Sequence, residues 1–451
     1  MLDWLLERLI SGGGRAALAA RGTVDSYAAL CDAIAAWSAR FADAAIVGRV
    51  VSIEGDYSTD TVAAFIGAAI GGNIVVPISS GSRQHEAEFL KLAEVEFRVR
   101  PDESRRIVPT HQAASHEMYR RLRRAANPGL VLFSSGTSGV HKAAVHDLGL
   151  LLDKFKVERH AYRTLLFLQL DHIGGVNTLF YTLSNLGTVV VPEGRMPRQV
   201  CDSIARHRVQ LLPTSPTFLN LLLLSDEQHR HDMSSLELVT YGTEPMPALT
   251  LRRLNDAFPN VRLLQTYGLS ELGILRSQSR APDSLWIRVG GEGFETKVVS
   301  GRLFIRAHSA MLGYLNAPSP FDSEGFFDTG DMVEQDGDWL RILGRASEII
   351  NVGGSKVFPV EVENTLLAMD NVTDVEVHGE PSSLTGQIVA ATVRLATPEP
   401  ALEFKTRMRL FCRDRLSAYK IPSRVTFTDS LHSARFKKIR NASARPAEAE
   451  A

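Results

Sequence analysis

The segment "LVLFSSGTSGVHKAAVHD", from Leu130 to Asp147, joins an apolar run to a cluster of small residues and then to one lysine. The apolar run predicts a buried strand. The small residues after it leave backbone N–H groups free to face an anion, and hydroxyl groups and a lysine add further donors. The segment therefore predicts a phosphate-binding loop, whose candidate ligands are Ser134, Ser135, Gly136, Thr137, Ser138, Gly139 and Lys142.

The spacing within this loop excludes a Walker A motif. That motif has four residues between its glycines and a Ser or Thr directly after its lysine. Here two residues separate Gly136 from Gly139, and Ala143 follows Lys142. Taken alone, the segment is either another kind of phosphate loop or an ordinary flexible turn.

The composition limits the classes of protein to consider. The chain has 451 residues, which exceeds the size at which one core keeps growing, so two or more domains are expected. The 50 Lys and Arg residues balance 51 Asp and Glu residues, which argues against a nucleic-acid binder or a polybasic membrane protein. No apolar run approaches the roughly 20 residues that span a bilayer.

The cysteines and the first residues favour a cytosolic protein. Cys31, Cys201 and Cys412 are odd in number and widely spaced, which is typical of reduced thiols. The start "MLDWLLERLISGGG" carries acidic residues where a secretory signal needs positive charge, and its leucines form an amphipathic helical stripe.

The pattern along the chain predicts an α/β fold. From residue 27 to about 280, apolar helical stretches alternate with β-rich runs such as "RVVSI", "NIVVPI" and "VQLLPT", which favours layers with largely parallel sheets. Short strands beyond about residue 285 predict a smaller β-rich subdomain. We expect a large N-terminal domain over residues 1–345, a small mobile α+β domain over 346–441 and a disordered tail over 442–451.

Three further segments have residues suited to nucleotide binding. "QTYGLSELG" combines an aromatic ring, a hydroxyl and a carboxylate in Tyr267, Ser270 and Glu271, although a plain turn at a strand end has the same composition. "FFDTGD" offers Asp331 for paired ribose hydroxyls, or else forms a solvated acidic turn. "LGRASEIINVGGSKVFPVEVE" adds Arg345, which in isolation is also consistent with a surface salt bridge.

The order and spacing of these segments resemble the adenylate-forming superfamily over roughly residues 20 to 440. This superfamily includes acyl-CoA and aryl-CoA synthetases, luciferases and the adenylation domains of nonribosomal peptide synthetases. "SSGTSGVHK" resembles its phosphate loop, "YGLSE" its Tyr-Gly-x-Thr-Glu motif, "TGD" its ribose motif and "GRASEIINVGGSKVFPVEVE" its hinge segment.

The resemblance implies a two-step reaction. A carboxylate attacks the α-phosphate of Mg·ATP to give an acyl adenylate and pyrophosphate, and a thiol then displaces AMP. The first step joins two anions, so phosphate donors, Mg²⁺ and lysine are needed to neutralise charge. The implied cofactors are ATP and Mg²⁺, and the implied acceptor is CoA or the phosphopantetheine of an acyl carrier protein.

The resemblance also assigns roles to residues. Thr137 and Lys142 are expected at the pyrophosphate end, and Glu271 at Mg²⁺. Tyr267 is expected to pack on adenine. The remaining nucleotide contacts implied are Gly242, Thr243 and Glu244 of "YGTEPMP" in the adenine pocket, Gly268 beside Tyr267, Ser270 at the α-phosphate, and Asp331 with Arg345 at the ribose.

The C-terminal catalytic lysine is expected in "DSLHSARFKKIRN", which resembles the family's Pro-x-x-x-x-Gly-Lys ending. Aligning His432 with that proline selects Lys438, and Lys437 is the alternative. The chain departs from the family pattern at His141, where proline is usual, and at Lys437, where glycine is usual.

The expected acid pocket follows from "LQLDHIGGVNTLF", which resembles the pocket segment of CoA ligases. His172 is expected at the aromatic gate, with a satisfied core histidine as the alternative. Ile173 stands where peptide-synthetase domains have the aspartate that binds an α-amino group, so an α-amino acid is disfavoured. The other pocket positions are Gly174, Asn177, Val239, Tyr241, Thr266 and Ile274, which describe a mostly apolar slot for an aryl or short-to-medium acyl acid.

The second step is implied by the hinge segment. Ser347 occupies the hinge position, and Gly354 matches the position beside the pantetheine tunnel. The leading hypothesis is an acid:thiol ligase. The alternatives are an adenylate-forming enzyme with another second step, such as oxidation or amide formation, and a degenerate member that binds nucleotide or carrier protein without turnover.

Overall fold

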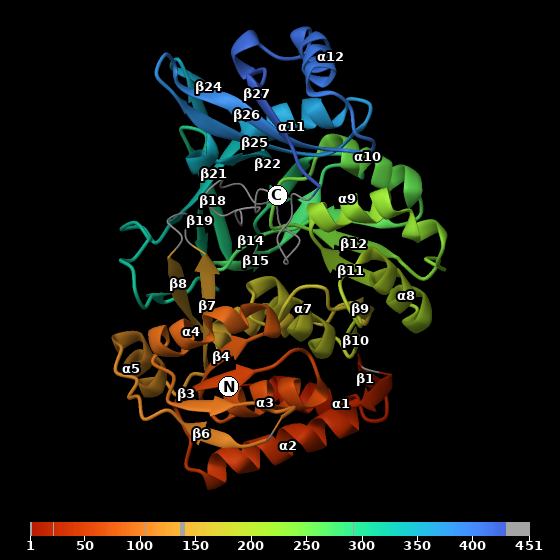
Figure 1. Ribbon diagram of the computed structural model, residues 1–451. Coiled ribbons are helices and arrows are strands. Elements are labelled where there is room, and N and C mark those ends of the chain that lie inside the picture. The colour runs from red at the N-terminus through yellow and green to blue at the C-terminus, as the bar shows by residue number, and fades with distance from the viewer. Residues whose placement is uncertain (1, 21, 104, 136–139, 292, 430–451) are drawn as a thin grey trace, which may run out of the picture.

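The phosphate-loop segment lies in the first of two large sheets. Figure 1 shows the computed structural model, which describes residues 2–20, 22–103, 105–135, 140–291 and 293–429. This seven-stranded sheet has the order β20-β8-β7-β4-β3-β5-β6, with β3, β4, β5 and β7 parallel and β8 antiparallel to β7. Its strands are β3 (Val50–Glu54), β4 (Ile74–Ile78), β5 (Phe97–Val99), β6 (Ile107–Pro109), β7 (Gly129–Ser135), β8 (His141–Asp147) and β20 (Gly313–Tyr314).

The second large sheet is also seven-stranded and is parallel except at the β1–β2 edge. Its order is β13-β12-β11-β9-β10-β1-β2. The strands are β1 (Ala16–Ala20), β2 (Thr23–Ser26), β9 (Arg163–Leu165), β10 (Thr188–Val190), β11 (Leu211–Thr214), β12 (Leu238–Tyr241) and β13 (Arg262–Gln265).

A helical layer lies between the two sheets and forms the central core. The apolar side chains of Leu18 on β1, Val51 on β3 and Phe65 and Phe180 on the helices belong to one buried cluster. Ser26 and Ser58 start two of these helices by accepting bonds from backbone N–H groups, as N-caps do. The layer contains α1 (Asp3–Ser11), α2 (Tyr27–Asp43), α3 (Thr59–Ile70), α6 (Leu148–Leu152) and α7 (Ile173–Ser184).

Further helices cover the outer faces of the two sheets. Separate apolar clusters join α4 (Glu86–Leu92) and α5 (Glu117–Arg124) to the first sheet, and α8 (Pro197–His207), α9 (Pro216–Ser225) and α10 (Ala248–Ala257) to the second. The expected alternation of helices and buried strands is therefore confirmed. Within the described residues, no helix is long and apolar enough to cross a bilayer.

A β-rich subdomain follows the large sheets. Its six strands have the order β16-β17-β22-β21-β19-β18, and the short hairpin of β14 (Tyr267–Leu269) and β15 (Gly273–Leu275) precedes them in the chain. They are β16 (Ser277–Ser279), β17 (Trp286–Val289), β18 (Phe294–Val299), β19 (Arg302–Ala307), β21 (Phe327–Asp336) and β22 (Trp339–Arg345).

The C-terminal elements form a separate α+β unit with its own apolar core. After the short turn Ala346–Glu348, the chain forms β23 (Ile350–Val352), β24 (Ser355–Val357), α11 (Pro359–Leu367), β25 (Val372–Ser382), β26 (Gly386–Leu395), α12 (Ala401–Arg413) and β27 (Arg424–Phe427). Figure 1 shows this unit beside α10 and β22. The predicted class, an α/β domain with a β-rich subdomain and a small C-terminal domain, is confirmed. The predicted mobility and the exact boundaries stay predictions.

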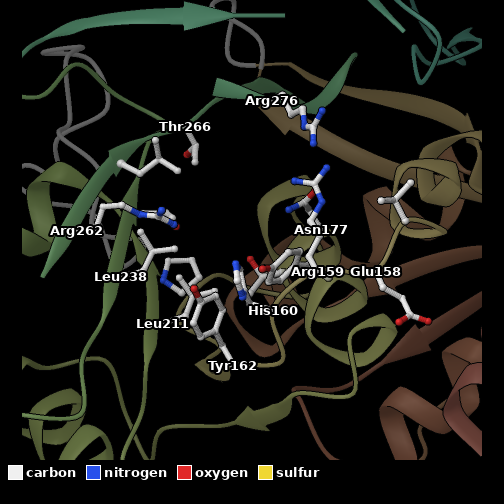
Figure 2. Close-up of a pocket in the computed structure, with 16 residues that line it drawn as sticks. Glu158, Arg159, His160, Tyr162, Asn177, Leu211, Leu238, Arg262, Thr266 and Arg276 are labelled. Carbon is white, nitrogen blue, oxygen red and sulfur yellow. The ribbon is translucent and has the colours of Figure 1, made fainter. Parts of the chain in front are cut away.

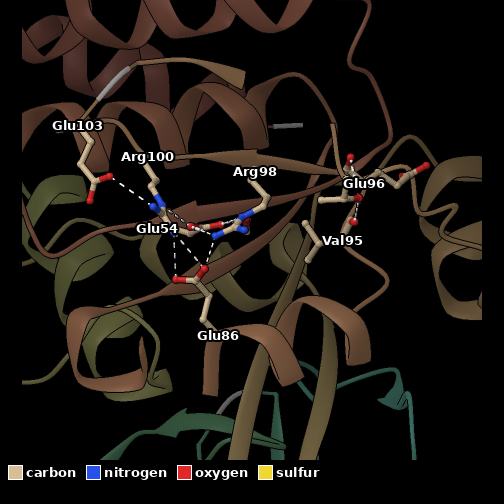
Figure 3. A network of polar contacts seen from close by, with 9 residues as sticks. Glu54, Glu86, Val95, Glu96, Arg98, Arg100 and Glu103 are labelled. Carbon is tan, nitrogen blue, oxygen red and sulfur yellow. Dashed lines mark hydrogen bonds and ion pairs between the residues drawn. The ribbon is translucent and has the colours of Figure 1, made fainter. Parts of the chain in front are cut away.

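A buried ion network ties the first sheet to α4 (Figure 3). Glu54, at the end of β3, is 8% exposed and accepts bonds from Arg98 Nε at 2.7 Å and Arg100 Nε at 2.8 Å. Glu86 of α4 contacts both arginines. Burial alone would raise the pKa of Glu54, but the bonds from Arg98, Arg100 and Ser52 outweigh it and the pKa is lowered.

Glu54→Gln is expected to lower the free energy of unfolding by about 3 kcal/mol at pH 7, because it removes one partner of a buried ion pair. The carboxylate stabilises the fold above the pKa of the unfolded chain, so this difference is expected to shrink as pH falls through the lowered pKa of the folded state. Urea unfolding from pH 7 to 3.5 measures it. Glu103→Gln, at the exposed edge of the network, is the control and is expected to cost under about 1 kcal/mol.

Candidate active site

A small cavity brings together residues of four of the predicted nucleotide segments. It measures about 190 Å³ and is lined by Thr243, Glu244, Pro245, Gln265, Thr266, Tyr267, Gly268, Leu269, Asp331, Ile342, Gly344, Arg345 and Glu348. The edges of β12, β13 and the β14–β15 hairpin form one side, and β21 and β22 form the other. The segments "YGTEP", "QTYGL", "TGD" and "GRASE" thus meet at one place, although up to 100 residues separate them in the chain.

Asp331 is the centre of a hydrogen-bonded group in this cavity. Its Oδ2 accepts a bond from Tyr267 Oη at 2.5 Å, and its Oδ1 lies 2.8 Å from Arg345 Nε. Arg345 also donates to the backbone oxygen of Thr329 at 3.2 Å. Burial raises the pKa of Asp331, while Arg345 and Tyr267 oppose that shift. The carboxylate keeps unused lone pairs on both oxygens, which suits it to accept hydroxyl groups of a sugar.

In residues 242–244, which follow β12, the backbone packs closely against Thr266. A Cβ on Gly242 would lie 2.7 Å from Thr266 Oγ1 and 2.8 Å from its backbone oxygen, so only glycine fits. Thr243 has a φ of 74°, and Glu244 Oε1 accepts the backbone N–H of Thr217 at 2.7 Å. These contacts hold the chain as a rigid turn after β12.

Glu271 and Lys142 both contact Tyr314. The Tyr314 hydroxyl donates to Glu271 Oε1 at 2.5 Å, and Lys142 Nζ lies 5.1 Å from the centre of the same ring. Tyr314 is on β20, which pairs with β8, so the sheet fixes it beside Lys142. Ser270, next to Glu271, is half-buried in the turn between β14 and β15. No sequence pattern indicated Tyr314, because it lies more than 40 residues from Glu271 and still farther from Lys142.

The phosphate-loop segment begins with the predicted strand, β7, and ends in a second strand, β8. Residues Ser134 and Lys142 pair across the antiparallel strands β7 and β8, and Ser135 pairs with His141. The central residues Gly136, Thr137, Ser138 and Gly139 lie outside the described part of the chain, as do Lys437 and Lys438. Their expected roles stay predictions.

The hinge and tunnel residues lie on exposed turns. Ser347 is in the turn Ala346–Glu348, one residue before Glu348, which lines the small cavity. Gly354 lies in the exposed hairpin between β23 and β24 with a φ of 86°. It lines neither the small cavity nor the larger one described next, so its predicted place beside a tunnel is untested.

A second cavity of about 720 Å³ adjoins the first (Figure 2). Thr266 lines both cavities, and Asn177 of α7 lines the larger one. Their expected place in an acid pocket stays a prediction. Leu211, Pro213, Leu238 and Leu264 form an apolar wall on the second large sheet. The other lining residues are Val157, Glu158, Arg159, His160, Tyr162, Thr178, Tyr181, Thr240, Arg262 and Arg276.

The structure corrects two expected pocket residues. Val239 and Tyr241 are each 1% exposed and pack into the cluster under α8, α9 and α10. Successive side chains of a strand point to opposite faces, so their neighbours Leu238 and Thr240 face the cavity instead. The expected slot was also too apolar, because the side opposite the sheet is basic.

The remaining pocket positions do not line the larger cavity. Ile173 is buried in the central core, and Gly174 lies beside Leu168 in the first turn of α7. Ile274 packs against the same core, and its backbone oxygen accepts a bond from Lys154 Nζ at 2.8 Å. Their predicted contacts with the acid stay predictions.

His172 starts α7 and is partly exposed beside Asp171, with 3.9 Å between its Nε2 and Oδ1 of the aspartate. Asp171 is buried, and its Oδ2 accepts bonds from the hydroxyls of Ser79 and Ser82. Burial alone would raise the pKa of Asp171, but His172 and the two serines outweigh it and the pKa is lowered. Asp171 therefore supports the turn before α7.

Comparisons with known proteins agree with this geometry. A family model described as AMP-binding enzyme matches residues 11–315, and one described as AMP-binding enzyme C-terminal domain matches residues 361–438. The chain belongs to the AMP-binding enzyme family. The predicted membership in the adenylate-forming superfamily is confirmed.

Several members of the AMP-binding enzyme family resemble this chain. Indoleacetate–CoA ligase of Aromatoleum aromaticum is 28% identical over 339 residues, which are 69% of this chain and 66% of that protein. 4-Coumarate–CoA ligase 1 of Arabidopsis thaliana is 27% identical over 68% of this chain and 61% of that protein. This chain spans half to two thirds of the length of the curated relatives it matches.

A solved structure supports the fold of this family member. The anthranilate CoA ligase AuaEII in complex with anthranoyl-AMP has a TM-score of 0.81 and 23% identity, covering 97% of this chain and 95% of that one. At this identity the likeness shows the fold alone.

Proposed function

We propose that this chain activates a carboxylic acid with ATP to form an acyl adenylate, and then transfers the acyl group to the thiol of CoA. The observation that carries the proposal is the pair of adjoining cavities that share Thr266. The smaller one has an Asp331 group suited to a ribose, and the larger one has room for an organic acid.

The residues beside the small cavity fit Mg·ATP. Glu271 Oε1 is bonded to Tyr314, so its second oxygen is left to face a cation. Mg²⁺ is usually bound by one or two carboxylates together with phosphate oxygens and water. Lys142, whose Nζ lies over the ring of Tyr314, adds a positive charge for the phosphates. In this arrangement Glu271 would hold the metal, which would neutralise the phosphates when bound.

The acid is proposed to lack an α-amino group. Among the described residues that line the larger cavity, Glu158 is the one carboxylate, and it is largely exposed and lies 3.4 Å from Arg8. Asp171, which precedes the first turn of α7, is already bonded to Ser79 and Ser82. Arg159 and Arg276 line the cavity and would repel an ammonium group. An aryl or short-to-medium acyl acid fits the apolar wall of the second sheet. The support for CoA is the activity in the names of relatives such as indoleacetate–CoA ligase and 4-coumarate–CoA ligase 1.

Pyrophosphate release over a panel of carboxylic acids, with ATP, Mg²⁺ and CoA, tests this function. We expect release that depends on an acid, with AMP as the nucleotide product. α-Amino acids are expected to rank below every aryl and acyl acid that reacts. A panel led by an α-amino acid would refute the assignment of the pocket. Adenylate that forms but is not passed to CoA would support an alternative second step such as amide formation.

A further inference from the structure

The larger cavity holds a group of cations without anionic partners. Arg159, Arg262 and Arg276 line it together with His160 (Figure 2). None of the three arginines has an ion pair with a carboxylate among the residues that the structure describes. Glu158 is the acidic side chain in the lining, and it is 76% exposed and lies 3.4 Å from Arg8. The cavity therefore has an excess of positive charge.

The like charges are close enough to influence one another. Partial desolvation and the neighbouring charge of Arg276 lower the pKa of Arg159. Figure 2 shows Arg159 and Arg276 on the same side of the cavity, with Arg262 across from them. Bringing cations together costs free energy unless an anion binds between them. Exposed arginines elsewhere in this chain, such as Arg280 and Arg206, have carboxylate partners.

A lysine behind the cavity sets the orientation of Asn177. Lys154 Nζ donates to Asn177 Oδ1 at 2.6 Å and to the backbone oxygen of Ile274 at 2.8 Å. Burial, together with the charge of Arg159, lowers the pKa of Lys154 to about 7. Because the oxygen of Asn177 is taken, its NH₂ group is the part left for a ligand. Asn177, Arg159 and Arg276 thus all present donors to the cavity.

From this arrangement we infer that the acid carries a second anionic group, apart from the carboxylate that is activated, and that Arg159, Arg276 and Asn177 bind it. A carboxylate or sulfonate has only acceptor oxygens, so it matches a site made only of donors. Lys154 is a positioning residue that acts through Asn177. The inference rests on the proposed function and names the substrate class of the same cavity.

Matched acids test this inference. Each pair consists of a dicarboxylic acid and its monoamide, for example terephthalate and 4-carbamoylbenzoate, which have the same shape and differ in charge. We expect kcat/KM in pyrophosphate release to favour the diacid by at least about 10-fold in the best pair, as a charge-assisted contact provides. Binding of each acid without turnover is followed by the shift in thermal unfolding temperature with AMP present.

Variants then locate the second anion. Arg276→Gln is expected to bring the diacid-to-monoamide ratio toward one, and Arg276→Glu to reverse it. Arg280→Gln is the matched control, because it removes an equal charge from an exposed arginine that pairs with Asp336 outside the cavity. Lys154→Met is expected to lower the same ratio by raising KM for the diacid more than it changes kcat.

Two results would overturn the inference, and a third would refute the proposed function. Monoamides that match diacids in every pair, while pyrophosphate is still released, would overturn the inference and leave the proposed function standing. A rise in KM for CoA in Arg276→Gln, with no change for any acid, would overturn it by assigning the arginines to the CoA phosphates. A lack of turnover with every acid would refute the proposed function, and the thermal shifts would then decide whether the cavity prefers dianions.

Discussion

Glu271→Gln is expected to lower the rate of acyl-AMP formation by about 100-fold or more. The substitution keeps the size of the side chain and its bond from the Tyr314 hydroxyl, but it removes the negative charge that would hold Mg²⁺. Losing a charged contact that forms in the transition state usually costs this much. Pyrophosphate release at several Mg²⁺ concentrations measures the effect, with thermal unfolding to verify the fold.

Tyr314→Phe tests how far the position of the Glu271 carboxylate matters, apart from its charge. This variant keeps the carboxylate and removes only the hydroxyl that holds it. We expect a much smaller loss than for Glu271→Gln, and one that higher Mg²⁺ partly restores. If Glu271→Gln released pyrophosphate at the normal rate, Glu271 would not be the Mg²⁺ ligand, and another residue would have to bind the metal.

Lys438→Ala is expected to lose most of the adenylation rate, about 100-fold or more, yet still to convert supplied acyl-AMP to thioester. In the proposed mechanism a lysine from the C-terminal domain bridges the carboxylate and the α-phosphate only during adenylation. We propose that the domain then turns about the hinge near Ser347 for the thiol step. One substitution should therefore affect the two half-reactions differently.

The matched variant for this test is Lys437→Ala. Adenylation and thioester formation are assayed separately for both variants, the second with synthetic acyl-AMP and CoA. An equal loss in both half-reactions for Lys438→Ala would contradict the alternating-domain mechanism. If Lys438→Ala had normal activity and Lys437→Ala were inactive, the mechanism would stand and Lys437 would be the catalytic lysine. The alignment of this segment would then be wrong by one residue.

The fold was largely predictable from the sequence because its signals are local. The apolar run "GLVLF" and the β-rich run "RVVSI" predict buried strands, and the structure forms β7 (Gly129–Ser135) and β3 (Val50–Glu54) at these places. The meeting of Tyr267, Asp331 and Arg345 was predicted by motif order, which reflects a shared fold rather than local physics.

The acid pocket was predicted less well for two physical reasons. Motif alignment selects positions in the chain, but the pleat of β12 decides which face each side chain takes, and it turns Val239 and Tyr241 into the core. The cations of the larger cavity come from separate segments, with Arg159 before β9 and Arg276 after β15. Only the folded chain brings them together, so no short pattern in the sequence could show the basic wall.

The central claim is that the carboxylate of the acid attacks the α-phosphate of ATP, and isotope transfer tests it most directly. An acid that reacts in the panel is labelled with ¹⁸O in its carboxyl group and incubated with ATP, Mg²⁺ and CoA, and the nucleotide product is analysed by mass spectrometry. Attack at the α-phosphate leaves one carboxyl oxygen on that phosphate when the thiol takes the acyl group. We predict AMP that carries one ¹⁸O atom, and ¹⁸O in inorganic phosphate with ADP as the product would contradict the account.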